Sequence, residues 1–355
     1  MKARQLARRH PFCLSCLALL ALLGPVGCGR RPVAPDPAII QLQLPRPVIF
    51  DTDMAHEDMF AALFLLAHPN VDVRAITVTG TGEAHCAPGV ARARGLIAVA
   101  GREGIPVACG RETPLAGSHE FPAGWRARAD AAYGVAISAP GQAAALSAPD
   151  LIADILRDAT GGITIVAVGP LTNLAEVIQN SPELTAAIEG IYVMGGAVGS
   201  RGNVGNSGVG IANEYAEWNI YIDPAAADIV FKAGIPITLV PLDATGDVPI
   251  TREFYDALAD QRNTPTAGLV YDLLTANLDF VGDGGFQFWD SLTAAIFTDA
   301  AIATFEEIPL RVVVAEGAES GRTLQDPDGA MMRVAVAADR AKFEQTLITI
   351  LNWEE

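Results

Sequence analysis

The chain has 355 residues, half of them hydrophobic, and carries a formal net charge of −17 at pH 7. Its length and hydrophobic content exclude an intrinsically disordered protein and suit one large α/β domain or two small ones. So strong a negative charge argues against binding to nucleic acid or to anionic membrane surfaces.

The N-terminus has the layout of an export leader. A basic start is followed by an apolar run at residues 12–23, which is too short to span a bilayer comfortably, and by small residues before Cys28. The sequence PVGC, which ends at Cys28, resembles a bacterial lipobox, although Pro25 stands where Leu is usual. We therefore predict that residues 1–28 form a leader, that Cys28 is lipidated, and that the protein is exported to the periplasm or cell envelope. A plainly cleaved signal peptide is the alternative.

The rest of the chain divides into a tether and one domain. Residues 29–46 are rich in proline and predict an extended tether, whereas residues 47–355 contain no internal linker. Within the domain, apolar runs rich in β-branched residues begin at residues 47, 73, 162, 189, 235 and 310, and several precede a helical pattern. This alternation predicts a single α/β domain with a mostly parallel central sheet and helices on both faces.

Four acids follow the first predicted strand within eight positions: Asp51, Asp53, Glu57 and Asp58. Apolar residues at helical spacing begin here, so the acids lie at the carboxyl end of a strand and in the first turn of a helix, where α/β sheets bind ligands. For Glu57 and Asp58, capping of that helix is the alternative. Asp51 and Asp53 would repel each other unless a cation or hydrogen bonds offset their charge. Asp53 and Asp58 would supply oxygen ligands to Ca²⁺ or Mg²⁺.

The predicted domain contains two cysteines, Cys86 and Cys109. An oxidising compartment permits a disulfide between them, and two buried thiols are an equal alternative. So few cysteines exclude a cysteine-ligated metal cluster.

The acidic segment DTDMAHED, at residues 51–58, is followed by four further motifs in order, at residues 168–175, 193–204, 216–224 and 285–296. Together they resemble the inosine-uridine nucleoside hydrolase family, whose signature is DxDxxxDD. The sequences RGNV, AEWN and FWD are most similar to the purine-preferring branch of that family. The resemblance covers the whole predicted domain and implies the Rossmann-like nucleoside hydrolase fold.

The resemblance also implies a metal centre and a reaction. Ca²⁺ would be held by the carboxylates of Asp53, Asp58 and Asp290 and by the main-chain carbonyl of Thr172, with Asp51 supporting them. Such hard oxygen atoms are the ligands that Ca²⁺ prefers. Family members hydrolyse the N-glycosidic bond of ribonucleosides to free base and ribose. Asp53 is therefore expected to take a proton from the attacking water, which the ion activates.

The same resemblance implies the substrate contacts. Trp125 and Trp289 match the tryptophans that stack on a purine base, although Trp125 lies in a stretch that looks like a loop. Trp218 is expected to pack in the core or to form the pocket wall. The residues expected around the sugar are Glu57, Glu83, Met194, Asn203, Glu217 and Asn219. For the last three, a place in a turn or a helix cap is the alternative.

Two positions depart from the family pattern, because Glu57 replaces an aspartate and Glu83 stands where relatives have Asn or Asp. These differences leave open a hydrolase of another N-glycoside. Further alternatives are a nucleoside- or sugar-binding lipoprotein without turnover and a Mg²⁺-dependent phosphatase-like hydrolase. His56 and His85 are expected at the surface or behind the residues that contact the substrate, and a role as general acid is the alternative for both. Relatives are commonly dimers or tetramers, so the resemblance implies a homo-oligomer.

Overall fold

The computed structural model describes residues 43–282 and 285–354. The predicted leader with Cys28 and the tether as far as residue 42 lie outside the described residues, so lipidation and export stay predictions. Within the part of the chain that is described, no helix is long and apolar enough to cross a membrane. Regular structure begins with a strand at Arg46, close to the predicted start of the domain.

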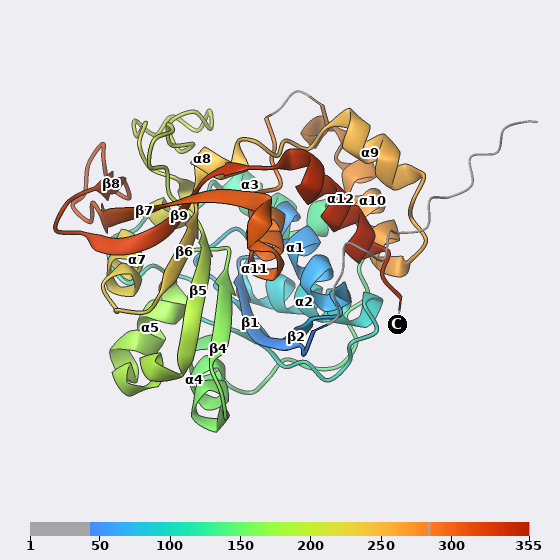
Figure 1. Cartoon of the computed structure of the whole chain (residues 1–355), viewed down its shortest axis with the longest axis horizontal. Coiled ribbons are helices and arrows are strands. Elements are labelled where there is room, and N and C mark those ends of the chain that lie inside the picture. Colours follow the sequence, from blue (N-terminus) through green and yellow to red (C-terminus); the bar gives the residue numbers. More distant parts are fainter. Residues whose placement is uncertain (1–42, 283–284, 355) are drawn as a thin grey trace, which may run out of the picture. The chain divides into compact units, whose positions relative to one another are not determined.

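A nine-stranded sheet forms the centre of the domain (Figure 1). Its order is β3-β2-β1-β4-β5-β6-β9-β7-β8; neighbouring strands from β3 to β9 pair in parallel, and β7 pairs antiparallel with β8 and β9. This confirms the predicted α/β class with a mostly parallel sheet. The strands are β1 (Arg46–Thr52), β2 (Val71–Val78), β3 (Val107–Cys109), β4 (Ile163–Ala167), β5 (Ile188–Met194), β6 (Ile237–Val240), β7 (Ala303–Val312), β8 (Thr323–Gln325) and β9 (Ala330–Ala338).

All six strands predicted from apolar runs are present, as β1, β2, β4, β5, β6 and β7. The sequence did not predict β3, β8 and β9. Two of these have only three residues, which is too few to show a periodic pattern, and β9 contains several alanines, which have little preference for strands.

Helices cover both faces of the sheet, and short 3₁₀ helices lie between them (Figure 1). The α-helices are α1 (His56–Ala67), α2 (Cys86–Val99), α3 (Ala123–Asp130), α4 (Ala148–Asp158), α5 (Thr172–Asn180), α6 (Trp218–Ile222), α7 (Pro224–Phe231), α8 (Leu242–Thr245), α9 (Arg252–Ala259), α10 (Pro265–Ala276), α11 (Trp289–Thr298) and α12 (Arg340–Leu351). The 3₁₀ helices are η1 (Ala132–Gly134), η2 (Pro182–Ala187), η3 (Leu278–Phe280) and η4 (Ala300–Ile302).

Side chains of the central strands alternate between two hydrophobic cores. In β1, Val48 and Phe50 join the core that contains residues of α1, α11 and α12, whereas Ile49 joins the core that contains residues of α4, α5 and α7. Because both faces of this strand are buried, its residues 47–50 are apolar without interruption instead of alternating with polar residues.

The carboxyl ends of β1, β2, β4 and β5 meet at one edge of the sheet, because these four strands are parallel neighbours. The segments that follow these ends carry most of the predicted site. Asp53 follows β1, Glu83 follows β2, Thr172 follows β4, and Met194 is the last residue of β5. The sheet therefore brings together motifs that are far apart in the sequence.

Candidate active site

A cavity of about 520 Å³ is lined by residues from this edge of the sheet. Asp51 and Thr172 are buried but do not line it. All other predicted site residues of the domain do: Asp53, Glu57, Asp58, Glu83, Trp125, Met194, Asn203, Glu217, Asn219, Trp289 and Asp290.

The Asp58 carboxylate organises the turn between β1 and α1. Its Oδ1 accepts hydrogen bonds from the N–H groups of Asp53 at 3.1 Å and Met54 at 3.2 Å, and also from the Thr52 hydroxyl. Its Oδ2 accepts a hydrogen bond from the N–H of Ala55 at 3.0 Å. Asp58 thus caps α1, as the alternative predicted, and the same bonds fix the backbone of Asp53 beside the cavity.

Three acids in the cavity are close enough to share a cation. Ligand oxygens of Glu57, Asp58 and Asp290 all lie within 4.8 Å of one another. The buried Oδ2 of Asp290 has no hydrogen-bond partner among the described residues. Burial and the neighbouring carboxylates raise the pKa of Asp290 well above its usual value. A hard divalent cation would bind that oxygen and offset the repulsion, so this donor set fits the predicted metal.

Asp53 also lines the cavity, but it is not one of those three acids. Its Oδ2 accepts a hydrogen bond from the N–H of Glu83 at 2.9 Å. Only glycine fits at position 82, because a Cβ there would lie 2.3 Å from this oxygen. Burial and the charges of Asp58 and Glu83 raise the pKa of Asp53 well above its usual value. A carboxylate with a raised pKa in a cavity suits a general base near neutral pH.

Asp51 lies behind the cavity and is held by two hydrogen bonds. Its Oδ1 accepts one from the Thr77 hydroxyl at 2.6 Å and one from Nδ2 of Asn173 at 2.8 Å. Burial raises the pKa of Asp51 to about 7, against the opposing effect of these bonds. Asn173 directly follows Thr172, so Asp51 is linked to the segment that carries the expected carbonyl ligand. The sequence did not single out Thr77 or Asn173.

Glu217 combines a structural role with a place in the cavity. Its carboxylate caps α6 by accepting hydrogen bonds from the N–H groups of Asn219 at 2.8 Å and Ile220 at 3.2 Å, and it accepts another from Gly196 at 3.0 Å. Burial raises the pKa of Glu217 to about 7. Glu217 therefore caps a helix, as the alternative predicted, and it also lines the cavity.

The two predicted asparagines also bind the backbone. Nδ2 of Asn219 donates to the carbonyls of Val168 at 2.9 Å and Met194 at 3.3 Å, which joins α6 to the ends of β4 and β5. Oδ1 of Asn203 accepts a hydrogen bond from the N–H of Trp218 at 3.1 Å. These bonds fix the orientation of both amides where they line the cavity.

Aromatic side chains line another part of the cavity. Trp125 lies within α3, so the expectation of a loop at this residue was wrong; alanine and arginine around it favour a helix. Its ring centroid lies 5.2 Å from that of Trp218, which stacks on Phe121 at 5.2 Å and so forms both core and pocket wall. Trp289 begins α11. The aromatic residues of the lining are Phe121, Trp125, Tyr133, Trp218, Phe280, Phe286 and Trp289.

Tyr133 is a lining residue that the sequence did not indicate. Its hydroxyl donates a 2.6 Å hydrogen bond to Oε2 of Glu83. Burial raises the pKa of Tyr133 well above its usual value, so the hydroxyl remains a donor. Burial also raises the pKa of Glu83 to about 7. Fifty positions separate the two residues, and no local pattern could have predicted their contact.

The two histidines near the acids have different surroundings. His56 is buried and lines the cavity, so the expectation that it lies at the surface or behind the lining residues was wrong. Its ring centroid lies 4.7 Å from those of Phe60 and Phe280, and burial lowers the pKa of His56 to about 3, which keeps the ring neutral. His85 is exposed, and its Nδ1 lies 2.7 Å from a carboxylate oxygen of Asp130.

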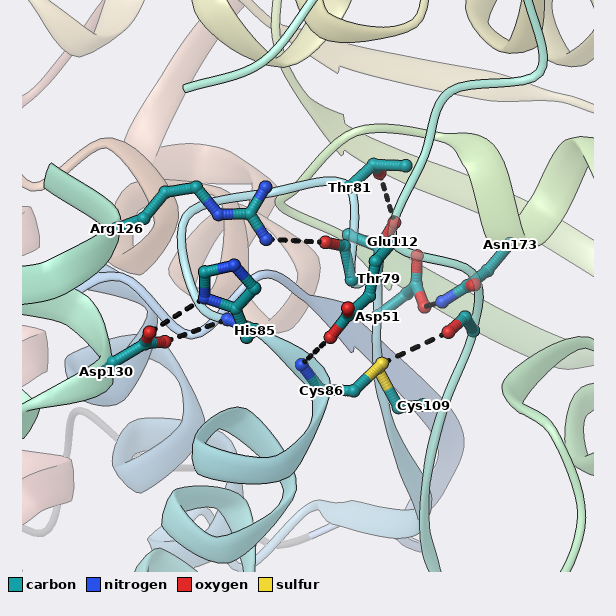
Figure 2. Close-up of a disulfide and its surroundings, with 12 residues drawn as sticks. Asp51, Thr79, Thr81, His85, Cys86, Cys109, Glu112, Arg126, Asp130 and Asn173 are labelled. Atoms are coloured by element: carbon teal, nitrogen blue, oxygen red, sulfur yellow. Dashed lines mark hydrogen bonds and ion pairs between the residues drawn. A yellow bond between two sulfur atoms is a disulfide. The ribbon is translucent and has the colours of Figure 1, made fainter. Parts of the chain in front are cut away.

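A disulfide joins Cys86 and Cys109, a pairing that the sequence left open (Figure 2). It connects the first residue of α2 to the last residue of β3. The bridge therefore anchors one end of the segment at residues 79–85, which carries Glu83 into the cavity. Figure 2 also shows Arg126 of α3, whose guanidinium donates a 3.0 Å hydrogen bond to the carbonyl of Gly80 in this segment.

The buried acids at the carboxyl edge of this mostly parallel sheet define a class of α/β protein with a site that could hold a metal ion. Residues 48–345 match the model of the family described as inosine-uridine preferring nucleoside hydrolase. The chain belongs to this family and is a nucleoside N-ribohydrolase, which cleaves the N-glycosidic bond of ribonucleosides. The predicted family and enzyme class are confirmed, and family membership argues against the phosphatase-like and non-catalytic alternatives.

Relatives of this chain are described with different base preferences. The chain is 38% identical over 231 residues to a pyrimidine-specific ribonucleoside hydrolase RihA from Shewanella sp. (strain MR-7), covering 64% of this chain and 69% of that protein. Its fold resembles a plant nucleoside hydrolase, PpNRh1, with a TM-score of 0.78 and 29% identity, covering 87% and 99% of the two chains. It also resembles a purine-preferring ribonucleoside hydrolase from Gardnerella vaginalis, with a TM-score of 0.71 and 26% identity, covering 86% and 99%.

Proposed function

We propose that the protein is a Ca²⁺-dependent hydrolase that prefers purine ribonucleosides. The observation that supports the preference is the presence of Trp125 and Trp289 in the same cavity as the clustered acids. Indole rings offer flat faces large enough to stack on a bicyclic base.

Ca²⁺ is the metal that the donor set favours. The proposed ligands are the carboxylates of Asp53, Asp58 and Asp290 and the carbonyl of Thr172, and the position of Glu57 adds a further carboxylate oxygen nearby. Calcium accepts six to eight oxygen ligands, so the sugar hydroxyls of a substrate can complete the shell. When bound, the ion lowers the pKa of water and orients the sugar.

The residues of the chain have separate tasks in the proposed reaction. Asp53 takes a proton from the attacking water as the bond between sugar and base breaks. Positive charge then develops on the sugar ring, and the clustered carboxylates stabilise it. Asn203, Glu217 and Asn219 hold the sugar hydroxyls, since each lines the cavity with its side chain already oriented.

A preference for pyrimidines is the second candidate. It is favoured by the relatives with 34–38% identity to this chain, which are described as pyrimidine-specific. Those relatives match about two thirds of this chain. The tryptophans favour the first candidate, because a pyrimidine ring would cover less of each indole face.

The test is release of free base and reducing sugar by the leaderless protein from inosine, adenosine, guanosine, uridine and cytidine. Each reaction is run with calcium, with magnesium and with excess chelator. Turnover that requires calcium and is fastest on the first three nucleosides is the expected result. Faster turnover of uridine and cytidine would replace the purine proposal by the pyrimidine one, and full activity with chelator would contradict the metal proposal.

We also propose export and lipidation at Cys28, which rest on the sequence of the leader. In a bacterial host, the full-length protein is expected in the membrane fraction with a lipid-modified Cys28 by mass spectrometry. Cys28→Ala should abolish the modification, whereas an unmodified soluble wild-type protein would favour simple secretion.

A further inference from the structure

We infer that Arg92 is a positioning residue that holds together two strained turns of the active site. This inference rests on the proposed function, because one of the turns carries the proposed metal ligands and base. Arg92 belongs to α2, does not line the cavity, and is 4% exposed.

The first observation is where the backbone is strained. Among the described residues other than glycine, three have a left-handed backbone: Met54 with φ of 56°, Ala132 with 49° and Tyr133 with 51°. Residues other than glycine rarely adopt this backbone conformation unless neighbouring structure enforces it. Met54 lies in the turn that Asp58 organises, and Ala132 and Tyr133 form the turn that places the Tyr133 hydroxyl on Glu83.

The second observation is that Arg92 binds the first turn and the end of the helix that leads into the second. Its Nη1 donates a 2.7 Å hydrogen bond to the carbonyl of Met54, the left-handed residue itself. Its Nη2 donates to the carbonyl of Ala129, at the end of α3 and three positions before Ala132. A planar guanidinium can donate two bonds in fixed directions, which an ammonium group cannot do.

The third observation concerns its charge. Within the described residues, Arg92 forms no ion pair and binds only main-chain carbonyls with its side chain. Burying a cation without a carboxylate partner costs free energy. The two hydrogen bonds that Arg92 donates give a reason for its buried position, because they fix Asp53 and Tyr133 relative to each other.

Arg102 provides a matched control. It follows the same helix, is partly buried, and its Nη1 donates a 3.0 Å hydrogen bond to the carbonyl of Leu66 at the end of α1. This contact is of the same kind but reaches no left-handed residue and no residue of the cavity. Loss of Arg102 removes one hydrogen bond to a main-chain carbonyl and loss of Arg92 removes two, and of the two arginines only Arg92 connects the active-site turns.

The experiment compares Arg92→Lys, Arg92→Met and Arg102→Met by amide hydrogen exchange of the metal-free protein. The relevant amides are those of residues 53–55, which bind Asp58, and those of Gly134 and Val135. Arg92→Met should speed exchange at both turns at least tenfold, and Arg92→Lys should have a smaller effect in the same direction. Arg102→Met should leave both turns within twofold of wild type.

Calcium affinity by calorimetry, kcat and KM provide the functional readout. Arg92→Met should weaken calcium binding and lower kcat at least tenfold, with Arg102→Met within twofold of wild type. Unchanged exchange at both turns in Arg92→Lys and Arg92→Met would overturn the inference, and Arg92→Lys alone decides if Arg92→Met does not fold. The proposed function fails separately, if the wild-type protein neither binds calcium nor cleaves nucleosides while the exchange result holds.

Discussion

The acidic part and the aromatic part of the cavity are built in different ways. The acidic part consists of Asp53, Glu57, Asp58 and Asp290, and hydrogen bonds to the backbone hold the carboxylates of Asp53 and Asp58. The aromatic part consists of Phe121, Trp125, Tyr133, Trp218, Phe280, Phe286 and Trp289, whose rings mostly contact one another across separate elements.

This difference indicates which part can vary. Moving the carboxylate of Asp53 or Asp58 breaks hydrogen bonds to buried backbone groups, which is costly. Exchanging one aromatic ring for another mainly changes packing and the space left for a base. We therefore expect the acidic part to determine the reaction and the aromatic part to determine which base is accepted.

The largest effect is expected for Asp53→Asn. Loss of the general base should lower kcat by about 10² to 10⁴-fold, to a similar extent with inosine and with uridine. Asp130→Asn is the control, because Asp130 pairs with His85 outside the cavity lining. Steady-state release of base measures both variants, and turnover by Asp53→Asn close to that of wild type would show that another group accepts the proton.

The next largest effect is expected when the disulfide is removed. Cys86→Ser with Cys109→Ser opens a bridge between residues 23 positions apart, which should lower the free energy of unfolding by about 3 kcal/mol. Urea denaturation measures this change, and reductant should weaken the wild type but not the double variant. KM should rise for purine and pyrimidine substrates alike, because the bridge anchors the segment that carries Glu83. An unchanged unfolding midpoint would mean that packing alone holds this segment.

A selective effect is expected for Trp289→Ala. Loss of a stacking face should lower kcat/KM for inosine about tenfold or more, with a smaller loss for uridine. Trp353→Phe, two residues after the end of α12 and outside the cavity lining, controls for general effects of replacing a tryptophan. Equal losses on the two substrates would contradict a stacking role and leave Trp289 as a support for Asp290.

The smallest effect concerns pH. The pKa of Asp51 and that of Glu217 are each raised to about 7 by burial, so the folded state binds protons that the unfolded state has lost. Stability of the metal-free protein should therefore fall as pH rises above the unfolded pKa near 4, and level off above about 7. Between pH 6 and pH 7 each group should lower the free energy of unfolding by about 1 kcal/mol.

Urea denaturation in chelator across pH 5 to 8 measures this trend. Bound calcium should reverse it, because the ion binds carboxylates only after they lose their protons. Stability that does not fall with pH above about 6.5 in chelator would contradict the raised pKa values of Asp51 and Glu217, because the opposing contribution of buried His56 is confined to lower pH.

The sequence by itself determined the α/β class, six strands and the acids of the cavity lining, and its motifs indicated the family. This was possible because a doubly covered sheet leaves continuous apolar runs, and because residues after parallel strands must meet at one edge. Tertiary structure alone decided the buried position of His56 and the Cys86–Cys109 pairing. It also decided the Tyr133 contact to Glu83 and the position of Arg92 between two turns. These features depend on contacts between segments far apart in the chain, and a local pattern carries no information about which distant residue will fill the space beside it.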